Sequence, residues 1–197
     1  IGKFAFYANR NLTRLYLPSS LKTIGEQAFR SCTGLLSVLL PSTLENVGAH
    51  AFYRCTQLTV YSDAQSVPES WDTRWNSSFR PVMLGCTLSE DGSYVVSVTI
   101  NESLMLNVER LSESGDSAPV LGNNRFSSPS RRGYNFSGWT TQADGTTPEL
   151  TGSDIADLPE GTTLYTVWEV ETEEPDDEEP GEGEIDWPWS DVPSLWS

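Results

Sequence analysis

The chain has 197 residues, of which 12 are basic and 28 acidic, so its formal net charge is −16. This length allows one or two ordinary domains, and 37% hydrophobic residues are enough for a modest core. No apolar run approaches the roughly 20 residues of a membrane-spanning helix, and the acidic balance argues against nucleic acid as a partner.

A 23-residue repeat dominates the first part of the chain, over positions 1–84. The chain returns to the same residue types at each step: Ile1-Gly2, Ile24-Gly25 and Val47-Gly48; Ala5-Phe6, Ala28-Phe29 and Ala51-Phe52; Leu12, Leu35 and Leu58. Such a period indicates a solenoid, because one coil cannot bury its apolar face alone and stacked coils can. Position 1 lies inside a repeat, so we expect the chain to be a piece of a longer protein.

Each repeat contains a short strand followed by a turn. Leu15 and Leu17, like Val38 and Leu40, alternate with other residues, which is the pattern of a strand with one buried face. Pro18 and Pro41 end these strands because proline has no N–H for the sheet. The Ala-Phe segments 26–30 and 49–54 predict one short turn behind the strand. We therefore expect about three coils, with the central Phe29 buried against Phe6 and Phe52.

The end of the repeat array also has a predicted structure. Trp71 and Trp75, four residues apart, are expected to share a helical face and cover the last coil. Asn9, Cys32 and Cys55 occupy one repeat position, so their side chains should stack. The two cysteines fit buried free thiols best, with a disulfide as the open alternative.

The pattern I-G-x-x-A-F-x-x-C-x-x-L-x-x-[IV]-x-L-P-x-x-L resembles the BspA-type leucine-rich repeats of bacterial surface proteins and some parasitic protists. The match covers about residues 1–61 of a predicted unit 1–84. The third copy departs from the pattern, because Leu58-Thr59-Val60-Tyr61 has no Leu-Pro after it. Such degeneration is expected of a terminal, capping repeat.

Residues 85–168 form a second predicted module. Residues 94–100 and 163–168 read as strands, 104–108 as a candidate partner strand, and a short helix is expected to start at Ser153. The run G-Y-x-F-x-G-W from Gly133, with T-L-Y-x-x-W from Thr163, resembles the Listeria–Bacteroides (internalin B-type) repeat over about 94–168. That resemblance implies a small β-grasp-like α+β module with an aromatic core of Tyr134, Phe136, Trp139, Tyr165 and Trp168. An aromatic platform for carbohydrate is the alternative.

Residues 169–197 contain 12 acidic and no basic residues, together with several Pro and Gly. This composition predicts a disordered acidic linker or tail. Trp187, Trp189 and Trp196 leave open the alternative that the segment docks on a partner. The complete expectation is thus a mixed β/α chain: a leucine-rich repeat solenoid (1–84), a β-grasp-like module (85–168) and an acidic tail (169–197).

The sequence contains no recognisable catalytic constellation. It has no G-x-S-x-G, P-loop, G-x-G-x-x-G or H-E-x-x-H motif, and its only histidine, His50, is expected at the surface. We therefore predict a protein that is not an enzyme, with no cofactor and no metal site.

A binding surface is the remaining possibility. In the repeat strands, the residues that face away from the core should be Arg14, Tyr16, Ser37 and Leu39, and Tyr61 if the last strand slips by one. Tyr and Arg are favoured at protein interfaces. Together with the resemblance, this predicts an extracellular or cell-surface fragment for adhesion or recognition of a host or neighbouring-cell surface or matrix protein. The alternatives are a structural stalk and a carbohydrate-binding module.

Overall fold

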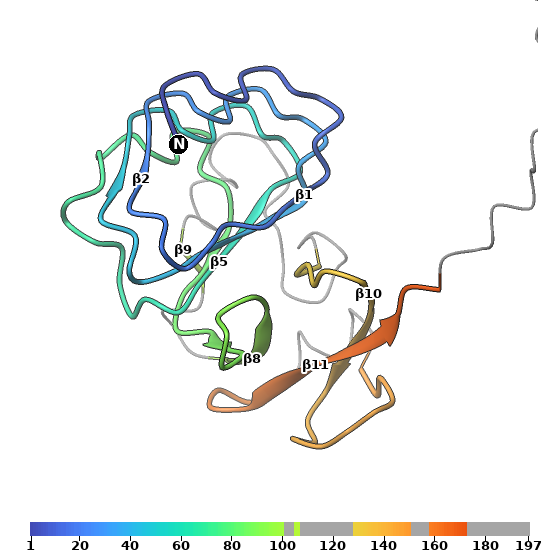
Figure 1. The fold of residues 1–197 in the computed structure, drawn as a ribbon. Helices are drawn as coiled ribbons and strands as arrows, with labels where there is room; N and C mark the ends of the chain where they lie inside the picture. The colour runs from blue at the N-terminus through green and yellow to red at the C-terminus, as the bar shows by residue number, and fades with distance from the viewer. Residues whose placement is uncertain (101–104, 107–127, 151–157, 173–197) are drawn as a thin grey trace, which may run out of the picture.

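The computed structural model describes residues 1–100, 105–106, 128–150 and 158–172 (Figure 1). The first part of the chain winds into a solenoid whose coils each contribute one strand to a parallel sheet: β1 (Arg14–Leu15), β3 (Ser37–Leu40), β5 (Thr59–Ser62) and β6 (Val82–Met83), with β9 (Met105–Leu106) antiparallel at the far edge. A second, two-stranded parallel sheet joins β2 (Thr23–Ile24) to β4 (Asn46–Val47).

The strand register explains how many coils the sequence makes. Arg14 pairs with Ser37, a full repeat later, whereas Ser37 pairs with Thr59 and Val60 with Val82, each one position short of a full repeat. The slip of the third strand by one position is thereby confirmed. The fourth strand, β6, comes from residues whose sequence no longer matches the repeat, so the described array has four coils rather than about three. Strand β6 needs only backbone hydrogen bonds to β5 and the apolar side chain of Val82 in the core, and neither requires the repeat sequence.

Stacked phenylalanine rings form the centre of the solenoid core. Phe29 has no exposed surface, and its ring lies 5.1 Å from that of Phe6 and 5.4 Å from that of Phe52, with nearly parallel planes. The predicted burial of Phe29 is confirmed. Trp75 closes the stack at 6.3 Å from Phe52, and Trp71 lies 5.1 Å from Trp75. The two indoles thus cover the third coil, the last one that the sequence predicts, but on a turn instead of a helix.

The turn behind each strand is also confirmed as a turn. In the first three coils, the residues at positions 4 and 8 have left-handed backbone: Phe4, Ala8, Gln27, Ser31, His50 and Arg54 all have φ between 54° and 62°. Such residues interrupt any helix. Their N–H groups instead donate to the next coil, as Phe4 N does to Glu26 O at 3.1 Å and Ala8 N to Arg30 O at 2.8 Å. These hydrogen bonds join successive coils on the side opposite the strands.

The second module is an antiparallel sheet of four described strands in the order β10-β11-β8-β7. They are β7 (Thr87–Leu88), β8 (Val95–Thr99), β10 (Tyr134–Thr140) and β11 (Thr163–Val170). A bulge interrupts the pairing of β10 with β11 between Phe136 and Gly138. The described residues contain no α-helix, so the mixed β/α class is not confirmed by them. The helix expected from Ser153 and most of the acidic tail lie outside the described residues.

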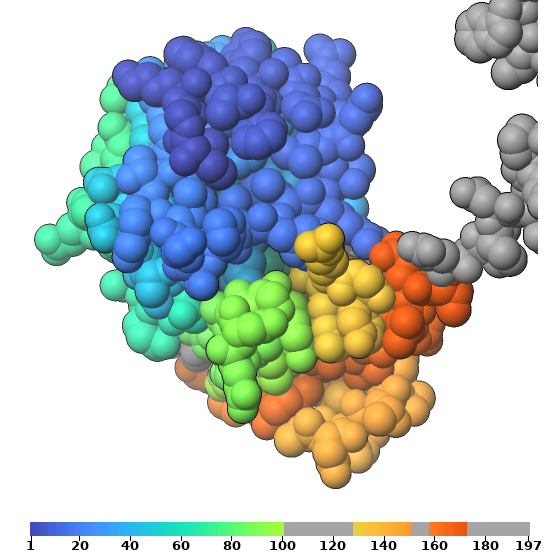
Figure 2. Space-filling model, in the orientation of Figure 1, coloured from blue at the N-terminus to red at the C-terminus, as the bar shows by residue number. Residues whose placement is uncertain are grey.

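The core of this module is not the predicted aromatic cluster. The five aromatic residues named above are all half-buried, although Phe136 contacts both Trp139 and Trp168, at 5.3 and 5.4 Å between ring centroids. The buried centre consists of aliphatic and sulfur side chains and a tyrosine, taken from both parts of the chain: Val95, Val98 and Leu164 with Tyr61, Met83 and Cys86. The module and the solenoid therefore share a core, and Figure 2 shows them packed against each other without a gap.

Candidate recognition site

The outer face of the solenoid sheet carries one row of large side chains. Leu39 pairs with Tyr61 and Tyr61 with Met83, and Tyr16 follows β1 at the position one full repeat before Leu39. Exposure falls steeply along this row. Tyr16 is 40% exposed and Leu39 half-buried, whereas Tyr61 and Met83 are 2% and 1% exposed. Only the β1 end of the face is open.

Two residues predicted on the open face are covered instead. Ser37 and Tyr61 are each 2% exposed, so the expectation that they face solvent is wrong. The reason is the second module: Tyr61 packs in the shared core, and the Ser37 hydroxyl lies 2.7 Å from that of Ser130. Burial also raises the pKa of Tyr61 well above the usual range. The alternation identified the outward side of the strands correctly, but that side is partly an internal interface.

Arg14 lies at the border between the open sheet and the module. It is exposed, and its Nη1 is 3.4 Å from Glu171 Oε1 while its Nη2 donates to Asn135 Oδ1 at 3.4 Å. Both groups of this ion pair are more than two-fifths exposed, and surface pairs of this kind contribute about 0–1 kcal/mol. The pair orients Arg14 beside Tyr16 and adds little to stability.

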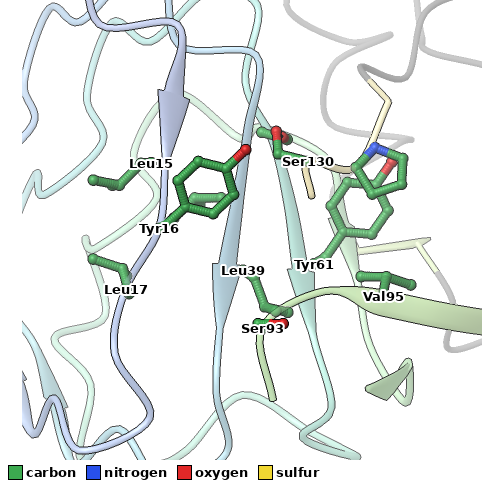
Figure 3. A pocket seen from close by; sticks show the side chains of 11 residues that line it. Leu15, Tyr16, Leu17, Leu39, Tyr61, Ser93, Val95 and Ser130 are labelled. Atoms are coloured by element: carbon green, nitrogen blue, oxygen red, sulfur yellow. The ribbon is translucent and has the colours of Figure 1, made fainter. Parts of the chain in front are cut away.

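A small pocket lies between the open sheet and the module (Figure 3). The solenoid contributes Tyr16, Ser37, Leu39 and Tyr61 to its lining, and the module contributes Ser93, Val95, Pro129 and Ser130. Its volume is about 20 Å³, whereas a single water needs about 10–15 Å³ on this measure. The pocket therefore accepts a water or the tip of one side chain, and is too small for a sugar or a cofactor.

The remaining reactive side chains have structural partners. The thiols of Cys32 and Cys55 donate to the carbonyls of Phe6 and Phe29, at 3.1 and 3.0 Å, and all three cysteines are free and buried. Free thiols, favoured by the sequence, are thus confirmed. His50 is half-buried, with its Nδ1 2.6 Å from Ser77 Oγ. Within the described ranges, no group of three or more His, Cys, Asp or Glu is placed to hold a metal.

Two groups of surface residues are not among those predicted from the sequence. The module's contribution to the pocket has no sequence signal, because Ser93, Pro129 and Ser130 belong to no motif. The second group had a signal: Tyr7, Arg30 and Tyr53 occupy one repeat position, and the structure stacks them, with the Arg30 guanidinium 5.7 and 5.2 Å from the two ring centroids.

Comparison with known proteins supports the repeat region. Residues 1–80 match the family described as BspA type leucine rich repeat region, six copies, so this part of the chain is a leucine-rich repeat region. A leucine-rich repeat protein from Bacteroides ovatus is 38% identical over 36% of this chain, and the T. pallidum leucine rich repeat protein is 36% identical over 36%. Both structures have a TM-score of 0.31, and the match covers only 18% and 32% of their lengths. A search of curated proteins found no match. Among the described residues, no helix is long and apolar enough to cross a membrane.

Proposed function

We propose that this chain is a non-catalytic recognition module that binds a protein partner through the open end of its repeat sheet, outside the cell. The observation that carries the proposal is the exposure of Tyr16 beside the half-buried Leu39, on the part of the sheet that the second module leaves uncovered. Arg14 borders the same surface. Tyr and Arg are among the residue types that most often anchor protein interfaces, and the repeat family supports a role in protein recognition and a place at the cell surface.

The second module limits how much of the repeat sheet a protein partner can contact. It covers Ser37 and Tyr61 and forms one wall of the pocket beside Tyr16. Only the β1 end of the sheet, around Arg14 and Tyr16, is left exposed, whereas a standard protein interface buries roughly 800 Å² per partner. We infer a weak complex for this chain alone, with Kd in the micromolar range, about 8 kcal/mol. The unit boundaries at 84 and 168, and the likeness of the module to the Listeria–Bacteroides repeat, form part of the same proposal.

The aromatic residues of the module give less support to carbohydrate binding. Sugar platforms need free ring faces, but the Arg131 guanidinium lies 3.6 Å from the ring centroid of Tyr134 and 4.1 Å from that of Tyr94. Trp168 lies edge-on to Tyr94 at 5.9 Å. These rings are engaged with one another and with Arg131, so protein recognition through the sheet is the better-supported function.

The test is binding of the full chain to purified extracellular-matrix and cell-surface proteins by biolayer interferometry, with a glycan array in parallel. Tyr16→Ala should weaken binding about tenfold or more, the effect of losing an interface hot spot. Tyr7→Ala is the matched control, because Tyr7 is 49% exposed but lies in the turn of the same coil, away from the sheet. Equal loss in both variants, or none in either, would contradict the proposal. Binding to glycans alone would favour a carbohydrate module, and no ligand at all a stalk.

A further inference from the structure

The turns of the first three coils carry a ladder of stacked rings and guanidinium groups. Arg30 lies between Tyr7 of the preceding coil and Tyr53 of the following one, at 5.7 and 5.2 Å from their ring centroids. The guanidinium of Arg54 lies 5.5 Å from the Tyr53 ring. We call these four residues the Tyr–Arg ladder. Figure 1 shows the turns of the first coil, in dark blue, on the side of the solenoid away from β11.

The ladder holds positive charge that the folded body does not neutralise. None of the ion pairs found among the described residues includes Arg30 or Arg54. Arg30 Nη1 donates to Gln27 Oε1 at 2.6 Å, and its Nε is buried without a hydrogen-bond partner. Stacking covers the flat faces of a guanidinium, and its N–H edge matches the geometry of a carboxylate. In Arg30 the Nη1 and Nε groups are engaged or buried, so Nη2 is the group that would meet a carboxylate, whereas the Arg54 side chain is exposed. The ladder therefore fits an acidic ligand.

Aromatic surface lies beside this charge. Tyr7 is 49% exposed and Phe4, in edge contact with Tyr7 at 6.2 Å between centroids, is 51% exposed. Large exposed aromatic side chains next to arginines favour a ligand that brings its own rings as well as carboxylates. An inorganic anion would use only the charge.

The chain itself contains a segment with this chemistry. Residues 173–197 hold ten acidic and no basic residues, with three tryptophans at 187, 189 and 196. Residues 1–84, by contrast, hold eight basic and five acidic residues. The two ends of the chain therefore carry net charges of opposite sign.

The start of this segment is tethered within reach of the ladder. Glu171 pairs with Arg14 at 3.4 Å, and Arg14 follows Tyr7 by seven residues, a span of at most about 25 Å. The chain from Glu171 to Trp187 can extend over about 50 Å, so the tether does not prevent contact. A tethered segment meets its site at an effective concentration in the millimolar range, at which individually weak contacts suffice.

We propose that the acidic segment 173–197 docks on the Tyr–Arg ladder of its own chain, with carboxylates on Arg30 and Arg54 and tryptophan rings against Tyr7 and Phe4. This contact is independent of the sheet face around Tyr16. It gives the acidic, tryptophan-bearing segment a partner within the molecule and covers the basic surface of the solenoid.

The experiment follows cleavage of the full chain by a glutamate-specific protease, with mass spectrometry of cuts after residues 173–184. At about 10 mM salt the Debye length is about 30 Å, and at about 1 M it is about 3 Å. At low salt, the variant Arg30→Gln/Arg54→Gln should be cut about tenfold faster than the wild type. A tenfold difference corresponds to about 1.4 kcal/mol in the free energy of docking. At high salt the two should be cut equally. Arg10→Gln/Arg132→Gln loses the same charge at two exposed sites outside the ladder and should behave like the wild type.

Two further measurements separate the alternatives. The single variant Arg54→Gln keeps the stack of the half-buried Arg30 between Tyr7 and Tyr53. An intermediate rate in a protein with unchanged melting temperature therefore excludes unfolding as the cause. Equal low-salt cleavage of wild type, ladder variant and control would overturn the proposal, and the ladder would then be a packing feature only. Protection that increases with protein concentration would also overturn it, by assigning the segment to a second copy.

Discussion

The Cα of Gly48 lies against the backbone of Glu26 in the preceding coil, so closely that a Cβ at position 48 would sit 2.5 Å from Glu26 N. Gly25 has the same relation to the first coil, where the distance to Lys3 N would be 2.6 Å. The contact explains the Gly in each Ile-Gly or Val-Gly pair: the backbones of successive coils approach too closely at this point for any side chain.

We predict that Gly48→Ala destabilises the protein by about 2–3 kcal/mol, toward the upper end for overpacking, because the obstructing atoms are backbone and cannot rotate away. The measurement is the free energy of unfolding in urea. Gly2→Ala is the control at the equivalent repeat position, since no atom lies within 4 Å of its added Cβ, and it should change stability by less than about 0.5 kcal/mol. Similar losses in both variants would show that the glycines act through backbone conformation instead.

The phenylalanine stack makes a second pair of matched variants. Phe29→Ala should cost about 3–5 kcal/mol, because the ring is fully buried between two others and leaves a cavity. Phe6→Ala removes the same ring at the open end of the stack, where it is 37% exposed, and should cost clearly less. Chemical denaturation measures both, and equal losses would contradict the stacking order.

These variants concern the part of the fold that the sequence predicts well. The 23-residue spacing of Phe6, Phe29 and Phe52 specifies both the stack and the coil that carries each ring. The fourth coil was missed because β6 keeps only backbone pairing and apolar Val82, and neither is visible as a repeat.

The candidate site was predicted only in part, for a different reason. Alternation shows which side of a strand is outward, and Arg14 and Tyr16 are exposed there as expected. It cannot show that Tyr61 and Leu164 belong to one core, because the two residues are about one hundred positions apart and share no periodic pattern. A large aromatic residue on an outward position suggests a ligand contact, whereas Tyr61 forms part of the interface between two parts of the chain.

The shared core predicts that the solenoid and the second module unfold together. Leu164 has no exposed surface and packs with Tyr61 and Met83, so Leu164→Ala should cost about 2–5 kcal/mol. Arg14→Ala breaks the exposed ion pair with Glu171, which directly follows β11, and should cost about 1 kcal/mol or less. Calorimetry should show one transition, shifted strongly by the first variant and slightly by the second. Two separate transitions would show that the interface does not couple the units.

The buried thiols make the free energy of unfolding depend on pH in the alkaline range. Burial raises the pKa of Cys86 from an ordinary value near 9 to about 12. Between these values the unfolded chain loses the thiol proton and the folded chain keeps it, so the unfolded state binds fewer protons and stability falls as pH rises. The stabilising effect is complete below pH 9 and is lost progressively up to pH 12, with a slope of at most about 1.4 kcal/mol per pH unit for one group. Urea unfolding at successive pH values should show this decline, and Cys86→Ala should make it shallower. Part of the slope should persist in the variant, because the pKa of Cys55, beside the Cys32 thiol and buried, and that of Tyr61 are raised as well. An identical slope in wild type and variant would show that Cys86 does not titrate differently in the two states.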